Sequence, residues 1–169
     1  MEQNINELLL RTAFACMACD GDIAQEEVNL IKNLDKEEQL FGDIKIENEL
    51  VSLLKEINEQ GKIFLKRYLN MVKDCQLNEE DSLRVLNVAV KTIKADNIIK
   101  YSEIKFFKVI KANLNVSDET ILEKIDGIDD MWVAQDIIDY ASLYKSYFDN
   151  IEMPEFDINV LASQGKEDK

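Results

Sequence analysis

Apolar side chains recur about every 3.6 residues along most of the chain, the spacing that is typical of amphipathic helices. Only five glycines and one proline interrupt this pattern among 169 residues. The fold is therefore predicted to be all-α, a compact bundle of about seven or eight helices with no strand. The predicted helices span residues 5–19, 25–40, 46–59, 62–75, 78–95, 102–113, 117–126 and 130–149.

A short motif appears twice, and its two copies lie 76 residues apart. Residues 19–28 are echoed by residues 95–104, and apolar positions on both sides of the motif keep the same offset. Each copy has an aspartate followed seven residues later by a glutamate. These acids are Asp20 and Glu27 in the first copy and Asp96 and Glu103 in the second. A fixed offset of this kind indicates that one helical unit was duplicated.

The residue after each aspartate also matches between the copies. Gly21 and Asn97 are the residue types that adopt a left-handed backbone most readily, so both motifs are predicted to be the same tight turn between two helices. We expect one helical domain over residues 1–152, with repeat units over 5–40 and 79–113 and C-terminal helices over 117–150. Residues 153–169 are expected to form an irregular tail.

The composition narrows the class of function. The formal charge is −14, so the surface repels nucleic acid and favours cations or basic protein surfaces. The chain has no histidine, which is the usual general base and the usual transition-metal ligand. No apolar run reaches the length of a membrane span, and three cysteines without a disulfide spacing fit a reducing compartment. A cytoplasmic protein is expected, with its oligomeric state open.

Cys16 and Cys19 form a C-x-x-C pair near the end of the first predicted helix. Redox-active pairs place the reactive thiol at the start of a helix, where the helix dipole lowers its pKa. These two thiols lie at the opposite end, where a thiolate is disfavoured. They are therefore predicted to be small buried core residues.

The first motif looks like the second half of a calcium-binding EF-hand loop, in which an acid, a glycine, an isoleucine and a glutamate follow in this order. The earlier ligand positions hold Cys16 and Ala18 in the first copy and Thr92 and Lys94 in the second. Neither copy alone can supply the roughly six to eight oxygens that Ca²⁺ needs.

Two half-sites could still form one site. If the repeats pack about a pseudo-twofold axis, their four carboxylates would share a shell suited to Ca²⁺ or Mg²⁺. Asp22 would join this shell from one side only, because the second copy has Ile98 at that place. The candidate metal ligands are Asp20, Asp22, Glu27, Asp96 and Glu103.

Helix capping is the alternative explanation of these acids. Glu27 and Glu103 fall in the first turn of a predicted helix, where the helix dipole stabilises a carboxylate by about 0.3–1 kcal/mol. Asp20 and Asp96 fall at the negative end of the preceding helix, where the same dipole disfavours them. Each of these aspartates therefore needs a compensating partner, either a cation or a backbone donor in the turn.

The arrangement of the motif resembles the TerB-like family over residues 8–34, and more weakly over 83–110. The matching residues are Asp20, Gly21, Ile23 and Glu27 in the first copy and Asp96, Ile99 and Glu103 in the second. The resemblance implies an all-helical, internally repeated acidic module whose motif acids bind a divalent cation. It also implies a role in tellurite or general stress response. The chain departs from the family pattern at Ala24 and Lys100, where the family commonly has Ser, Thr or Asp.

These observations favour a non-catalytic module that binds a divalent cation or a basic protein partner. One rival hypothesis is a metal-dependent hydrolase with a carboxylate-only site, in which two cations activate water. Another is a purely structural assembly scaffold, in which the acids only cap helices. The aromatic residues of the last predicted helix, which include Trp132, Tyr140 and Tyr144, fit a core and also a partner surface.

Overall fold

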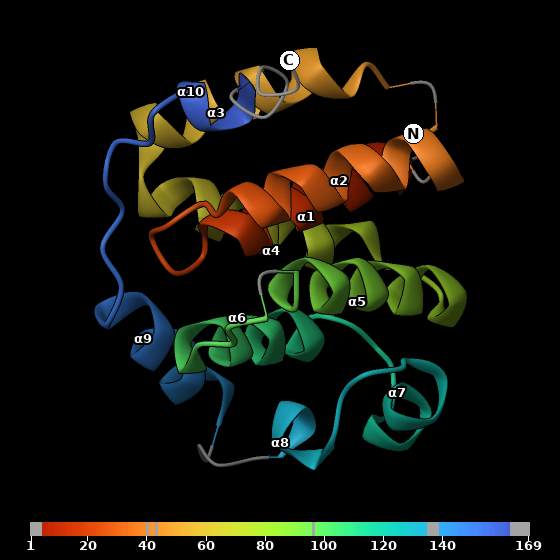
Figure 1. Cartoon of the computed structure of the whole chain (residues 1–169). Coiled ribbons are helices and arrows are strands. Elements are labelled where there is room, and N and C mark those ends of the chain that lie inside the picture. Colours follow the sequence, from red (N-terminus) through yellow and green to blue (C-terminus); the bar gives the residue numbers. More distant parts are fainter. Residues whose placement is uncertain (1–4, 40, 43, 96, 135–138, 163–169) are drawn as a thin grey trace.

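The computed structural model describes residues 5–39, 41–42, 44–95, 97–134 and 139–162, and all of their regular structure is helical. The predicted all-α fold is confirmed, with ten described helices of which three span seven residues or fewer (Figure 1). None of the described helices is long and apolar enough to cross a membrane. The helices are α1 (Ile5–Ala18), α2 (Gln25–Glu38), α3 (Ile46–Gln60), α4 (Lys62–Cys75), α5 (Glu79–Ile93), α6 (Tyr101–Ala112), α7 (Asp118–Lys124), α8 (Asp130–Val133), α9 (Tyr140–Asp149) and α10 (Asn159–Ala162).

Helix α1 is the centre of the core. Ten of its fourteen residues are buried, so it has almost no solvent-facing side, as is typical of a helix surrounded by others. Its most extensive packing is against α5, and it also contacts α2, α3, α4 and α6. Because α1 and α5 begin the two repeat units, the units meet along their first helices.

The backbone repeats the predicted 76-residue offset at the two turns. Helices α2 and α6 begin at Gln25 and Tyr101, which are 101 − 25 = 76 residues apart. Gly21 has φ +83° and Asn97 has φ +63°, so both are left-handed. The Gly21 amide donates to the Ala18 carbonyl at 2.9 Å and the Asn97 amide to the Lys94 carbonyl at 3.1 Å. The two motifs therefore share one turn conformation.

The predicted helix over 130–149 is wrong as a single element. It divides into α8 and α9, and Ala134 after α8 is extended, with ψ 144°. Asp139 then starts a new helix as its N-cap, because its carboxylate accepts a hydrogen bond from the Ser142 amide at 2.8 Å. Residues 135–138 lie outside the described residues.

The prediction of an irregular tail over 153–169 is also partly wrong. Residues 159–162 form α10, and both Phe156 and Leu161 are buried. The Asn58 side chain makes two hydrogen bonds with the Phe156 backbone, at 2.8 and 3.0 Å, and the Lys32 ammonium donates to the Leu161 carbonyl at 2.7 Å. These contacts join the C-terminal segment to α2 and α3 (Figure 1). Residues 163–169 lie outside the described residues.

Gly21 meets two requirements at once, and its replacement is a test of the fold. Besides its positive φ, a Cβ at this position would lie 2.6 Å from the Glu152 carbonyl oxygen. We expect Gly21→Ala to lower the free energy of unfolding by about 1–2 kcal/mol for the left-handed backbone alone, and further for the close contact. The measurement is urea unfolding. Asn97→Ala is the matched control in the same turn conformation and should cost less; equal losses would contradict a role for the Glu152 contact.

Candidate functional site

The two predicted motif glutamates are buried capping residues. Glu27 and Glu103 are each only 1% exposed. The Glu27 carboxylate accepts a hydrogen bond from the Ala24 amide at 3.0 Å, and the Glu103 carboxylate accepts one from the Lys100 amide at 2.8 Å. Each glutamate thereby satisfies a backbone donor at the start of its helix, α2 or α6. The capping interpretation is confirmed for this pair.

Asp20 has both of the partners that were expected as alternatives, a backbone donor in the turn and a cation. One carboxylate oxygen accepts a hydrogen bond from the Asp22 amide at 3.0 Å. The other forms an ion pair with the Lys100 ammonium at 2.9 Å, and the Asp20 side chain is only 7% exposed. The compensating cation therefore comes from the second repeat. The hydrogen bond to Asp20 in turn raises the pKa of Lys100 above its usual range.

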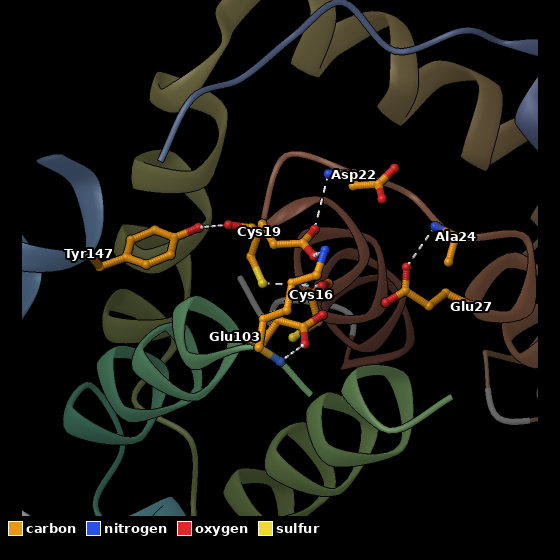
Figure 2. A network of polar contacts seen from close by, with 9 residues as sticks. Cys16, Cys19, Asp22, Ala24, Glu27, Glu103 and Tyr147 are labelled. Carbon is orange, nitrogen blue, oxygen red and sulfur yellow. Dashed lines mark hydrogen bonds and ion pairs between the residues drawn. The ribbon is translucent and has the colours of Figure 1, made fainter. Parts of the chain in front are cut away.

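Three of the candidate carboxylates act electrostatically on a thiol at the end of α1. Burial raises the pKa of Cys19 well above its usual range, and the charges of Glu103, Asp20 and Glu27 add to the rise. These carboxylates are therefore within electrostatic reach of one thiol. Figure 2 shows Glu27 and Glu103 reaching toward this region from α2 and α6. Asp96, the fourth member of the predicted set, lies outside the described residues.

Asp22, the fifth candidate, lies apart from this group. It is exposed, and its backbone amide rather than its carboxylate contributes the hydrogen bond to Asp20. Across the part of the chain that the structure describes, no three or more Cys, Asp or Glu side chains form a group that could hold a metal ion. The described carboxylates are arranged to accept protein donors, since oxygens of Asp20, Glu27 and Glu103 already accept amide or ammonium hydrogens.

The C-x-x-C pair is buried, as predicted from the sequence. Cys16 and Cys19 are fully buried, and the Cys19 thiol donates to the Cys16 carbonyl at 3.2 Å. Burial raises the pKa of Cys16 well above its usual range, and the charges of Glu103 and Glu27 raise it further. A thiolate, which is the reactive form of cysteine, is therefore disfavoured at both positions.

Two residues of this site were not foreseen from the sequence. The Tyr147 hydroxyl on α9 donates to the Cys19 carbonyl, and the side chain is fully buried (Figure 2). The sequence shows Lys100 as a departure from the family pattern and as a cation near the acid of the second motif, and the structure shows that it pairs with Asp20 of the first. The signal for Lys100 was its position, because a cation stands in the second copy where the first has Ala24.

A second feature, also missed in the sequence, is an acidic segment over residues 118–130. It includes α7 and the start of α8, and its six acidic side chains are all exposed. They are Asp118, Glu119, Glu123, Asp126, Asp129 and Asp130. Lys124 is its single basic residue, so the segment has a net charge of 1 − 6 = −5. Asp118, Glu119 and Asp130 lie in the first turn of a helix, where sequence analysis explains an acid by its interaction with the helix dipole.

The Asp20–Lys100 ion pair gives a test of how the two turns are held together. We expect Lys100→Met to lower the free energy of unfolding by about 1–3 kcal/mol, because it leaves the Asp20 carboxylate, which is only 7% exposed, without its ammonium. Asp20→Asn should cost less, because the Lys100 side chain is 47% exposed and stays hydrated. The coupling energy from the double-mutant cycle should reach about 1 kcal/mol. Since the pKa of Lys100 is raised in the folded state, this stabilisation is complete below pH 10.5 and disappears as the pH rises through the folded pKa.

The exposed pair of Lys145 and Asp149 is the control for this cycle. Its side chains are 75% and 56% exposed, so water and salt screen the attraction. Lys145→Met and Asp149→Asn should show a much smaller coupling in the same urea measurements. Equal coupling energies for the two pairs would contradict the special position of Asp20.

Comparison with known proteins gives no match from which a function could be proposed. No family model matches the chain, and no curated protein or solved structure matches it either. The TerB-like resemblance therefore rests on the short motif alone. The two features that remain as candidates for function are the paired acidic turns and the acidic segment over residues 118–130.

Proposed function

We propose that this chain is a non-catalytic binding module whose acidic segment over residues 118–130 binds a basic surface of a partner protein. The observation that carries the proposal is the concentration of six exposed carboxylates in thirteen residues, with Lys124 as the single basic residue of the segment. Two lysines from outside the segment also reach it: Lys111 pairs with Asp118 at 2.8 Å, and the Lys94 ammonium donates to the Gly127 carbonyl at 2.7 Å. Charges at this density create a local potential that attracts and orients a cationic surface.

The local structure supports a preorganised surface. Ser117 caps α7, since its hydroxyl accepts a hydrogen bond from the Thr120 amide at 3.1 Å. Asp129 caps α8 in the same way through the Met131 amide at 3.0 Å. Ile121 and Ile125 are buried and anchor the segment to the core. A partner would therefore meet carboxylates whose backbone is already fixed, which lowers the entropy cost of binding.

The test removes charge without removing caps. The variant carries Glu119→Gln, Glu123→Gln, Asp126→Asn and Asp130→Asn, and the probe is a decalysine peptide that stands for a basic surface. At about 0.35 kcal/mol per charge, the loss is about 1.4 kcal/mol, so the dissociation constant should rise about tenfold. Isothermal titration calorimetry measures it, and added salt should weaken binding by the unmodified protein.

A matched control distinguishes an effect of the segment from an effect of the overall net charge of the protein. Glu47→Gln, Glu59→Gln, Asp74→Asn and Glu155→Gln also remove four exposed carboxylates. Three of these lie on α3 or just before α10, at the opposite end of the molecule from α7 and α8 in Figure 1. The control should change the dissociation constant less than about twofold. Equal losses in the two variants would contradict a role for the segment.

A divalent cation at the paired turns is the second proposal, favoured by the negative charge that Asp20, Glu27 and Glu103 together place around Cys19. The described residues alone do not form a metal-binding group. A cation would therefore need Asp20 to release Lys100 and would need further oxygens, for which Asp96 is the candidate by sequence. The resemblance to the TerB-like family points to Ca²⁺ or Mg²⁺ and to a role in stress response.

Thermal melting in chelator and in metal tests this second proposal. An ion that binds only the folded state raises stability by about 2.7 kcal/mol at a hundredfold excess over its dissociation constant. Melting temperatures should therefore be higher in millimolar Ca²⁺ or Mg²⁺ than in EDTA. The shift should vanish in Asp20→Asn and grow in Lys100→Met, since that variant removes the competing ammonium. Equal melting temperatures in chelator and metal would contradict cation binding.

A further inference from the structure

A cavity of about 840 Å³ lies where the start of α1 meets the end of α4 and the start of α5. Its lining residues come from these three helices and from the short connection between α4 and α5. Its volume falls within the range of about 300–1,000 Å³ that is typical of small-molecule sites. None of its described lining residues belongs to the two motif turns or to the acidic segment over residues 118–130, so a ligand here would be independent of both.

Part of the cavity wall is apolar. Ile5, Met71 and Leu77 line it, and each of these side chains is half-buried and also packs against the hydrophobic core. Their inner sides are therefore fixed by the fold, while their remaining surface faces the cavity. An apolar ligand group that covers this surface removes it from water, which is favourable. The wall thus accepts an apolar group of a ligand.

Two opposite charges line the same cavity. The side chains of Arg67 and Asp74 are exposed, and neither forms an ion pair or a side-chain hydrogen bond with the residues that the structure describes. Asp81, the third charged residue of the lining, differs because its carboxylate pairs with Arg84 at 3.2 Å. The cavity therefore offers one guanidinium and one carboxylate to a ligand.

Helix α4 sets the distance between these two charges. Arg67, Met71 and Asp74 stand at positions i, i+4 and i+7, so they share one face of the helix, with the apolar side chain between the charges. At about 1.5 Å per residue, the backbone positions of the two charged residues lie about 10 Å apart along the helix axis. An extended chain of three residues spans about the same length, at about 3.3–3.6 Å per residue. The order of groups on α4 therefore matches a tripeptide, with a carboxylate at one end, an ammonium at the other and a side chain between them.

We propose that this cavity binds a short peptide of about three residues that has free ends and an apolar central side chain. Arg67 binds the terminal carboxylate, because a planar guanidinium donates two parallel hydrogen bonds to it. Asp74 accepts hydrogen bonds from the terminal ammonium, and Met71 contacts the central side chain. A dianion such as phosphate is disfavoured, because it has no positive group for Asp74 and because the Asp81 carboxylate also lines the cavity.

The tripeptide Ala-Leu-Ala is the probe for this proposal, in four forms: free, C-terminally amidated, N-terminally acetylated, and blocked at both ends. Each form is titrated into the isotopically labelled full chain, and the dissociation constant is measured from NMR shifts of the cavity residues. Amidation and acetylation each remove one charge of the peptide, so each should raise the dissociation constant about tenfold, which corresponds to about 1.4 kcal/mol. An absence of shifts at millimolar peptide would overturn the proposal. Equal binding of the free and the doubly blocked peptide would overturn it as well, because the cavity would then not recognise free ends.

Two variants assign each end of the peptide to its residue. In Arg67→Met the free and the amidated peptide should bind equally, because the partner of the carboxylate is gone. In Asp74→Asn the free and the acetylated peptide should bind equally for the matching reason. Lys73→Met and Glu80→Gln are the controls, since these residues are exposed and lie outside the cavity lining, and both should keep the full effect of blocking each end. An effect of amidation that persists in Arg67→Met, or of acetylation that persists in Asp74→Asn, would overturn the proposal.

Discussion

The burial of α1 on nearly all sides is the constraint on which the rest of the structure depends. A helix that ends inside a protein has terminal carbonyls, and a following turn, that water cannot satisfy. Here the Cys19 carbonyl accepts from Tyr147, the Asp22 amide donates to Asp20, and Asp20 pairs with Lys100. Side chains from α9 and from the second repeat therefore supply the hydrogen bond and the ion pair that the polar groups at this end need. The burial of α1 in the core therefore determines which polar contacts the following turn must make.

Local signals predicted the parts of the fold that local interactions determine. The break at Gly61 was visible in the sequence, and the residue there has φ +61° between α3 and α4. The left-handed residues Gly21 and Asn97, and the capping role of Glu27 and Glu103, were equally visible because their partners lie within a few positions. Asp139 was harder to recognise, since apolar spacing continues across it although its side chain starts a new helix.

Contacts between distant parts of the chain account for most of what the sequence did not reveal. Lys100 reaches Asp20 across eighty positions, and Asn58 reaches Phe156 across ninety-eight. The periodicity of hydrophobic residues predicts helices and does not predict such polar contacts between distant residues. The duplicated motif predicted that the two turns would be related, and the structure adds that a protein ammonium stands beside Asp20. Duplication has thus left two similar backbones with different surroundings.

The anchoring of residues 151–162 has a consequence for how the chain matures during synthesis. The first turn is completed by Tyr147 and by the passage of Glu152 beside Gly21, about 130 residues after the turn itself is made. A nascent chain that ends after α6 therefore has the first turn without that cover, and the end of α1 lacks its tyrosine. The N-terminal repeat is synthesised first. Its packing is nevertheless among the last to be completed, because contacts of such long sequence separation form slowly.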